Sequence, residues 1–285
     1  MYVSFEELLQ GMIKNALQED IGDGDHTTLS CIAPNARGKA VLKVKQAAVL
    51  AGVEIAQKIF HFNAPSAVIT TYFKDGDEVS PGDIVFDIEA HVHTILQCER
   101  VVLNTMQRMS GIASLTRQYA DAVKDYPVKI LDTRKTTPGF RLLEKAAVRI
   151  GGGYNHRFAL YDQILIKDNH IDYCGGIEPA LDRAFDYVKK LRPGLKIEIE
   201  TRNLEEVEQV LKSGKADRIM LDNFTPDLLQ QAVGIINRRM ETEASGGIHL
   251  GNVVDYAATG VDYISIGALI HQAKSIDLSL KATLQ

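Results

Sequence analysis

LKIEIETRNLEEVEQVLKSGKADRIMLDNFT, residues 195–225, contains one complete unit of the pattern that decides the fold class. A short apolar run ends in charged and polar residues at 200–203, and a helical segment is expected over Leu204–Ser213. A second apolar run then ends at Asp222-Asn223. Strands that alternate with helices in this way form right-handed βαβ units whose strands lie parallel in one sheet. This stretch therefore predicts an α/β fold.

The same order of strand, polar end and helix repeats from about Val128 onward. The six runs are VKILDTRKT (128–136), DQILIKDNH (162–170), LKIEIETRN (195–203), DRIMLDNFT (217–225), METEASGG (240–247) and VDYISIGAL (261–269). Further helices are expected over Pro179–Lys190, Pro226–Arg238 and Val253–Thr259. Six units without a glycine-rich dinucleotide fingerprint favour an open, incomplete α/β barrel over a doubly wound sheet. In such a barrel the carboxyl ends of the strands surround the active site.

The first third of the chain predicts a helix followed by a mostly antiparallel sheet. Ser4 and Glu7 form a capping box before an amphipathic helix, and 94–124 predicts a long helix with Ser110-Gly111 as a candidate break. Strands are expected within 38–50, 68–73 and 84–88, and a short helix over 52–60. The turn-rich KDGDEVSPGD (74–83) is similar to biotinyl-carrier sandwiches. It lacks the carrier's Met-Lys-Met sequence, so a structural hairpin is favoured.

The composition bounds the class of protein. A chain of 285 residues with 45% hydrophobic and 24% charged residues is ordinary for a soluble globular protein with one barrel-sized domain or two smaller ones. A net charge of −5 and a pI near 5.9 argue against bulk nucleic-acid binding. No apolar run is long enough for a membrane span, and the acidic N-terminal helix is unlike a targeting segment. Scattered Cys31, Cys98 and Cys174 indicate reduced thiols in a cytoplasmic protein.

Positive charge is concentrated at 131–170. This stretch has seven Lys or Arg residues against four acidic ones, a net charge of +3 within an acidic chain. Such a cluster attracts an anion. Arg134 and Lys135 follow a strand, where they suit a carboxylate or a phosphate. The alternative is an ordinary solvated loop, and the position at a strand end favours anion binding. Lys167 ends another strand and is a Schiff-base nucleophile, an anion ligand or a member of an ion pair, and its cationic neighbours favour the anion ligand.

Carboxylates and glycines end the other strands. Glu200 and Asp222 could share a metal ion, bind sugar hydroxyls, act as acid and base, or stabilise a developing cation. The turns Ser245-Gly246-Gly247 and Ser265–Ala268 predict a phosphate cradle built from backbone N–H groups. GGGYNHR (151–157) is either a ligand-binding loop that contains His156 and Arg157 or an idle flexible one. Arg141, Lys145 and Arg149 have helical spacing, which indicates ordinary helix charges.

These strings together resemble the quinolinate phosphoribosyltransferases, the decarboxylating nicotinate-nucleotide pyrophosphorylases of NAD synthesis. The matching segments span most of the chain in order: EDIGDGDHTT (19–28), ERVVLNTMQRMSGIA (99–113), LDTRKTTPGFRLLEKAAVRIGGGYNHRFAL (131–160), ILIKDNHI (164–171), IEIE (197–200), IMLDN (219–223), EASGGI (243–248) and ISIGALIH (264–271). The resemblance implies an N-terminal α/β sandwich over 1–112 that the segment 275–285 rejoins. It also implies an open α/β barrel over 113–274.

The resemblance also implies a reaction and a set of binding residues. Quinolinate and phosphoribosyl pyrophosphate, with Mg²⁺ as cofactor, would give nicotinate mononucleotide, pyrophosphate and CO₂. Arg134, His156 and Arg157 would hold the two quinolinate carboxylates, and Lys135 and Lys167 would face phosphoribosyl pyrophosphate. Glu200 and Asp222 would lie near the ribose hydroxyls and the metal, as direct or indirect ligands. The remaining substrate-binding residues would be Thr133, Ser245, Gly246, Gly247, Ile266, Gly267 and Ala268. Arg100 would serve a neighbouring subunit, so the protein would be a homodimer or a hexamer of three dimers.

Three other functions are compatible with the residues. A related pyrophosphorylase, such as the homologue associated with molybdenum transport, would act on another base and would be separated by substrate assays. A Schiff-base aldolase would use Lys167 and would yield a borohydride-trapped adduct. A non-enzymatic sensor of phosphorylated metabolites would bind without turnover, and the retention of both Glu200 and Asp222 argues against it.

Overall fold

The computed structural model describes residues 4–283, and these residues form two packed units. The first unit comprises residues up to Arg117, the segment Thr136–Gly152 and the residues from Leu269 onward. The second comprises Gln118–Lys135 and Gly153–Ala268. Residues 284 and 285, the end of the expected returning segment 275–285, lie outside the described residues. Within 4–283, no helix is both long enough and apolar enough to cross a membrane.

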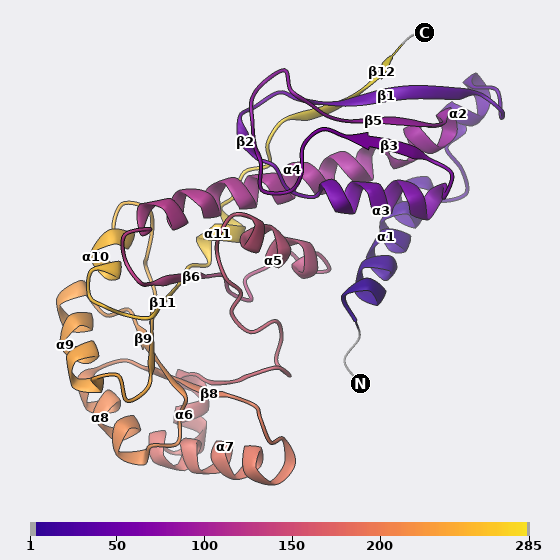
Figure 1. The fold of residues 1–285 in the computed structure, drawn as a ribbon. Coiled ribbons are helices and arrows are strands. Elements are labelled where there is room, and N and C mark those ends of the chain that lie inside the picture. Colours follow the sequence, from indigo (N-terminus) through magenta and orange to yellow (C-terminus); the bar gives the residue numbers. More distant parts are fainter. Residues whose placement is uncertain (1–3, 284–285) are drawn as a thin grey trace. The chain divides into compact units, whose positions relative to one another are not determined.

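The sheet of the first unit has the order β12-β1-β5-β3, and each neighbouring pair is antiparallel. Its strands are β1 (Arg37–Val44), β3 (Val68–Thr71), β5 (Ile84–His91) and β12 (Leu278–Thr283). Strand β12 pairs with β1 from Val44↔Leu278 to Lys39↔Thr283, so the C-terminal segment does return to the first sheet. The antiparallel sheet is confirmed (Figure 1). A small ladder joins β2 (Ala48–Val49) to β4 (Glu78–Val79).

Helices accompany this sheet in the first unit. They are α1 (Phe5–Ile21), α2 (His26–Cys31), α3 (Val53–Asn63), α4 (Val92–Ala122), α5 (Arg141–Ile150) and α11 (Ala268–His271), of which α4 and α11 extend across the unit boundary. The predicted capping box is present, because Ser4 and the N3 residue Glu7 each accept from the other's backbone N–H. Two serines of α4, Ser110 and Ser114, accept hydrogen bonds from the backbone of Ala51 and Val49.

Helix α4 is continuous through Ser110-Gly111, so the expected candidate break is wrong. Gly111 is required there for another reason. A Cβ on Gly111 would lie 2.0 Å from the carbonyl oxygen of Lys274, and no side chain fits at that distance. Glycine therefore lets the segment after α11 pass directly against α4. A glycine within a helical pattern marked a close approach of two backbones and not a helix end.

The second unit is built on a parallel sheet with the order β6-β11-β10-β9-β8-β7. Its strands are β6 (Lys129–Leu131), β7 (Ile164–Ile166), β8 (Ile197–Thr201), β9 (Arg218–Asp222), β10 (Glu241–Ser245) and β11 (Tyr263–Ser265). All six predicted strands are present. Strands β6 and β7 are the two edges of the sheet and do not pair with each other, so the barrel is open.

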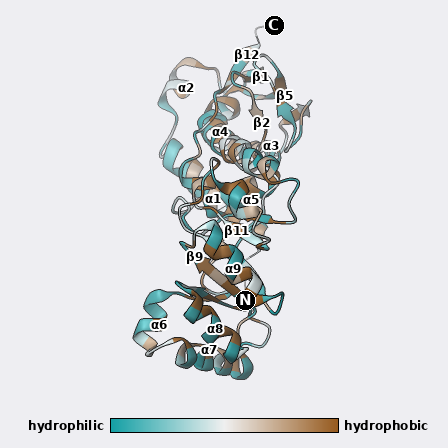
Figure 2. Ribbon diagram, turned by 90° about the vertical axis from the view of Figure 1, so that its left-hand side faces the viewer, coloured by the Kyte–Doolittle hydropathy of each residue, from teal (hydrophilic) through white to brown (hydrophobic). Residues whose placement is uncertain are grey.

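Helices lie along the outer side of this sheet (Figure 1). They are α6 (Asp168–Cys174), α7 (Ile177–Leu191), α8 (Leu204–Ser213), α9 (Pro226–Ile236) and α10 (Val253–Ala257). Asn203 caps α8, and Thr225 caps α9, in which Pro226 occupies the first helical position. Figure 2 shows strand β9 as largely hydrophobic and helix α7 with broad hydrophilic faces. The buried strands and amphipathic helices follow the expected α/β arrangement.

Candidate active site

The register of the parallel strands brings charged side chains onto one face of the sheet. Glu200 lies opposite Met220, and Asp222 lies opposite Ser245. Alternate residues of a strand share a face, so Glu198 and Glu200 both point to the side of the sheet on which Asp222 and Ser245 lie. This is the interior of the open barrel, since the strands' other faces pack against the helices. The register therefore places polar side chains from separate strands on one face of the sheet.

Lys167 and Glu200 form an ion pair at the ends of neighbouring strands β7 and β8. The Nζ atom of Lys167 lies 2.8 Å from Oε2 of Glu200. The lysine side chain is 46% exposed, whereas the glutamate side chain is almost buried. The backbone N–H of Lys167 also donates to Nδ1 of His170, which caps the start of α6. The pair thus presents one accessible cation whose carboxylate partner fixes its position.

Asp222 is held by its neighbours at the end of β9. Ser245 donates its hydroxyl to Oδ1 at 2.6 Å, and the side-chain amide of Asn223 donates to Oδ2 at 2.5 Å. Asn223 has a left-handed backbone with φ of 57°, and a Cβ on Gly246 would lie 2.2 Å from its Oδ1. Glycine at 246 is therefore needed so that Asn223 can reach Asp222. These contacts fix the carboxylate at the mouth of the barrel.

Arg134 and Arg157 are close enough for their charges to interact. Burial and, after it, the positive charge of Arg134 lower the pKa of the Arg157 guanidinium. Arg157 also donates from Nη1 to the carbonyl oxygen of Gln163 at 3.2 Å. Both arginines are half-buried. Two guanidinium groups held together against their mutual repulsion form a site that an anion with two carboxylates would neutralise.

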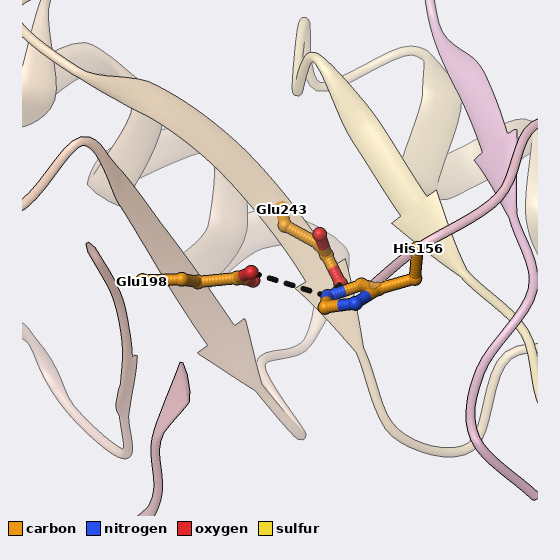
Figure 3. A group of neighbouring side chains, drawn as sticks. All are labelled: His156, Glu198 and Glu243. Atoms are coloured by element: carbon orange, nitrogen blue, oxygen red, sulfur yellow. Dashed lines mark ion pairs between the residues drawn. The ribbon is translucent and has the colours of Figure 1, made fainter. Parts of the chain in front are cut away.

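His156 contacts two buried glutamates. Figure 3 shows one edge of its ring facing the carboxylates of Glu198 on β8 and Glu243 on β10. The Nε2 atom is 3.1 Å from Glu198 Oε2 and 3.4 Å from Glu243 Oε1. The backbone N–H of His156 donates to Asp132 at 2.9 Å. The histidine is only 8% exposed, so its partners belong to the interior of the barrel.

The charges around His156 favour its protonated form. Burial alone lowers the pKa of the imidazole, but hydrogen bonds to Glu198 and Glu243 and the charges of these residues together raise it to about 9. One contact opposes this, because the backbone N–H of Arg157 lies 2.7 Å from Nδ1 and favours an unprotonated Nδ1. Nδ1 accepts this hydrogen bond, so a proton on Nδ1 would displace it, and the two carboxylates act in the opposite direction.

Glu243 is also paired with Arg218. The Nη1 atom of Arg218 lies 2.9 Å from Glu243 Oε2, and the guanidinium stacks 3.9 Å from the centre of the Tyr263 ring. Burial opposes ionisation of Glu243, but His156 and Arg218 lower its pKa. Burial and the charge of Glu243 raise the pKa of Glu198. The barrel interior thus contains a continuous polar array below the mouth.

The other predicted residues of the second unit lie in its loops. Lys135 is exposed, and its backbone N–H donates to the hydroxyl of Thr133 at 3.1 Å. Gly246 and Gly247 have positive φ values of 87° and 65°, as the predicted turn requires. Ile266 donates its backbone N–H to Leu131 and continues the β11–β6 ladder, and it is followed by Gly267 and Ala268.

Arg100 lies in the first unit, on α4. Its side chain is 65% exposed, and its guanidinium is 3.7 Å from Glu99. It lines a cavity of about 340 Å³ formed by residues of the first unit, among them Asp20, Asn104 and Arg108. The cavity walls combine cationic and amide side chains with the acidic end of α1.

Three features of the structure do not follow from the sequence analysis. Glu198 and Glu243 contact His156, and Arg218 pairs with Glu243, whereas the sequence predicts roles only for Glu200 and Asp222 among the strand acids. The IEIE and ETEAS alternation was the available signal, since it places acids on one strand face. Lys145 was expected to be an ordinary helix charge, but it is 2% exposed, so that expectation is wrong. Gly151 packs against α4, where a Cβ would lie 2.4 Å from Ala113 O.

Two clusters of side chains are candidates for holding a metal ion. Within residues 4–283, the one cluster of three potential ligands consists of His156, Glu198 and Glu243. Its carboxylates already have partners. Arg218 forms an ion pair with Glu243, and Gln163 donates a hydrogen bond to Glu198 at 2.7 Å. Glu200 and Asp222 lie at the strand ends and offer oxygen atoms to a hard cation, although Glu200 is already paired with Lys167 at 2.8 Å. Two carboxylates suit Mg²⁺ that brings substrate phosphates as its other ligands.

Comparison with known proteins shows a similar architecture and sequence in an enzyme family. The quinolinate phosphoribosyl transferase N-terminal domain model matches residues 25–110, and the C-terminal domain model matches residues 112–281. Quinolinate phosphoribosyltransferase [decarboxylating] 1b of Nicotiana tabacum is 44% identical over 96% of this chain and 82% of its own length. The probable nicotinate-nucleotide pyrophosphorylase [carboxylating] of Bacillus subtilis is 41% identical over 97% and 94%. The crystal structure of NadC from Streptococcus pyogenes superposes with a TM-score of 0.92, 39% identity and full coverage of both chains.

Proposed function

The chain belongs to the quinolinate phosphoribosyltransferase family, and we propose that the strand-end residues of its second unit carry the family's reaction. The enzyme transfers the phosphoribosyl group of phosphoribosyl pyrophosphate to quinolinate and releases CO₂. The products are nicotinate mononucleotide, pyrophosphate and CO₂. This reaction supplies nicotinate mononucleotide for the synthesis of NAD.

The paired arginines are the observation that best supports the quinolinate pocket. Arg134 and Arg157 interact electrostatically and are half-buried. His156, which we propose to be protonated, directly precedes Arg157 in the chain. Three cations gathered in this way match the two carboxylates of a pyridine dicarboxylate. Two guanidinium groups suit a base with two carboxylates better than a base with one. The pocket therefore favours quinolinate over nicotinate.

Lys135, Lys167, Glu200 and Asp222 form the phosphoribosyl side of the site in this proposal. The exposed lysines attract the pyrophosphate, while the carboxylates tolerate the positive charge that develops at C1 of the ribose as pyrophosphate departs. Glu200 and Asp222 would hold Mg²⁺ directly or indirectly, and the ion would neutralise charge on the leaving group. Lys167 remains close to Glu200 at 2.8 Å, so a cation and an anion face the same reacting centre.

The two glycine turns are proposed to bind the 5′-phosphate. The Ser245 hydroxyl is engaged by Asp222, so the backbone N–H groups of Gly246 and Gly247 are the better donors. Ile266, Gly267 and Ala268 follow the neighbouring strand and would contribute further N–H groups. Barrels commonly hold phosphate after their last strands, as this arrangement would.

A comparison of two bases tests the proposed function. The enzyme is incubated with phosphoribosyl pyrophosphate and Mg²⁺ plus either quinolinate or nicotinate, and nicotinate mononucleotide is measured by chromatography. Quinolinate is expected to give the product at least about 100-fold faster, because nicotinate lacks one of the two carboxylates that the cations recognise. Equal rates, or product from nicotinate alone, would refute the assignment of the dicarboxylate pocket.

Arg100 is proposed to complete the site of a second subunit, which makes a homodimer, or a hexamer of three dimers, the working form. Its guanidinium is largely exposed, and Arg100 belongs to the first unit, whereas the other proposed site residues belong to the second. The three cysteines within 4–283 are unpaired, which fits the proposed cytoplasmic location.

Subunit mixing tests the role of Arg100. Arg100→Ala and Lys167→Ala proteins are each expected to be nearly inactive. The two variants are unfolded together and refolded, so that about half of the dimers contain one subunit of each kind. Each mixed dimer has one intact site of its two, so about a quarter of wild-type activity should return. Confirmed mixed dimers with no more activity than the separate variants would contradict the shared site.

A further inference from the structure

We propose that Glu198 and Glu243 are positioning residues that hold the His156 ring in place and in its charged form, so that it strengthens the attraction for the substrate dicarboxylate. The inference rests on the proposed function and adds two residues to it. Neither glutamate is expected to touch substrate, since both are fully buried. They act through His156, which they reach from strands β8 and β10.

The contacts of His156 support this role. Nε2 lies within 3.1 Å of Glu198 and 3.4 Å of Glu243, so the ring is held from two strands at once (Figure 3). Asp132 fixes the other end of the residue by accepting its backbone N–H at 2.9 Å. The histidine therefore has little freedom to rotate, and a pre-oriented group loses less entropy when a ligand binds.

Glu198 also acts on Arg157. The side-chain amide of Gln163 donates to Glu198 at 2.7 Å, and the carbonyl oxygen of Gln163 accepts from Arg157 Nη1 at 3.2 Å. Glu198 thus supports two neighbouring members of the proposed quinolinate pocket, His156 directly and Arg157 through Gln163. A single buried carboxylate that orients two adjacent cations is typical of the supporting residues behind a binding site.

The charged groups around His156 come from several strands of the parallel sheet. Glu198 is on β8, Glu243 is on β10, Arg218 on β9 reaches Glu243, and Asp132 follows β6 and bonds to the histidine backbone. The two carboxylates favour an imidazolium, which agrees with the raised pKa of about 9. The charge is present below this pKa and is lost as the pH rises through it. Removing one carboxylate should therefore move the loss of charge to lower pH.

The decisive variant is Glu243→Gln, which keeps the shape of the side chain and removes its charge. KM for quinolinate at pH 8 is expected to rise about tenfold and to return toward the wild-type value near pH 5.5, while kcat changes less. Wild-type KM should stay flat from pH 6 to pH 8. Glu198→Gln is expected to change KM in the same direction, and Glu243→Asp should retain most of the wild-type pH profile.

Glu241→Gln is the matched control. Glu241 lies on the same strand and also pairs with Arg218, at 3.0 Å, but it is exposed and His156 is not among its partners. This variant should leave KM and its pH profile within about twofold of wild type. A KM that is unchanged in both Glu243→Gln and Glu198→Gln, or equal changes in the Glu241 control, would overturn the proposal.

A titration of the wild-type protein tests the proposal without any substrate and without a variant that must fold. The imidazole signals of His156 are followed by NMR, with His156→Asn used only to assign them. A pKa of about 9 is expected. A value at or below the ordinary 6.5 would overturn the proposal. Because no turnover is measured, failure of the proposed enzymatic function would be distinguished from failure of this inference.

Discussion

Replacing Arg134 with alanine is expected to lower kcat/KM for quinolinate by about 10²- to 10³-fold while the fold remains intact. The guanidinium is part of a half-buried cationic pair with Arg157, so in the proposed pocket its loss would remove a carboxylate contact. Most of the effect should appear in quinolinate affinity, because the proposed pocket would bind the substrate in its ground state as well as in the transition state. Steady-state kinetics and calorimetric titration with quinolinate measure the two quantities separately.

Arg149→Ala is the control for this variant. Arg149 belongs to the same basic stretch of sequence but is exposed near the end of α5. Its removal lowers the charge of the protein by the same amount, yet kcat/KM should stay within about threefold of wild type. Unchanged quinolinate affinity in Arg134→Ala, or equal losses in both variants, would mean that overall charge and not a defined pocket attracts the substrate.

Replacing Glu144 with alanine is expected to lower the free energy of unfolding by about 3–5 kcal/mol. Glu144 is fully buried in the first unit and accepts from Arg108 Nε at 3.0 Å and Nη2 at 2.8 Å. It also accepts from the backbone N–H of Thr137 at 2.8 Å. Arg108 in turn donates to the carbonyl oxygens of Ile270 and Ala273, so the variant leaves a largely buried guanidinium without its counter-ion.

A surface ion pair of the same unit provides the comparison. Glu6 lies 2.6 Å from Lys58, and both side chains are about half exposed. Glu6→Ala should have a far smaller effect than Glu144→Ala, since water and salt screen such pairs. Glu144→Gln should fall between the two variants, at about 1–3 kcal/mol. Urea unfolding monitored by circular dichroism gives the three values. Equal losses for Glu6→Ala and Glu144→Ala would contradict the role of burial.

Much of the fold could be predicted from local sequence because its signals are periodic. The six strand runs of the second unit and the helix Leu204–Ser213 follow from alternation of apolar runs with capped helices. Continuity of α4 could not be predicted, because the reason for Gly111 lies in Lys274, which is remote in sequence. A pattern within one element does not contain the position of a distant backbone.

The candidate site was predictable where its residues end strands. Lys167, Glu200 and Asp222 were predicted there, and the strands place Glu200 beside Lys167. The partners of His156 were missed because Glu198 and Glu243 lie inside strands, where buried acids are uncommon and are satisfied only by groups from other strands. The burial of Lys145 could not be predicted either, because helical spacing does not reveal which face of a helix a neighbouring element covers.

Loss of the 2-carboxylate is the step that joins the cationic pocket to the phosphoribosyl side of the site. We expect CO₂ to leave after the ring nitrogen is joined to ribose, because the positively charged pyridinium then stabilises the electrons left on the ring carbon. The first bond to form is therefore the one between nitrogen and C1, with pyrophosphate leaving.

Quinolinate labelled in the 2-carboxylate tests this central claim most directly. Released label and nicotinate mononucleotide are measured over time, with and without phosphoribosyl pyrophosphate, at fixed Mg²⁺. We expect label and nucleotide in equal amounts, and essentially no label when phosphoribosyl pyrophosphate is left out. Label released at the full rate without phosphoribosyl pyrophosphate, or nucleotide absent from the complete mixture, would contradict it.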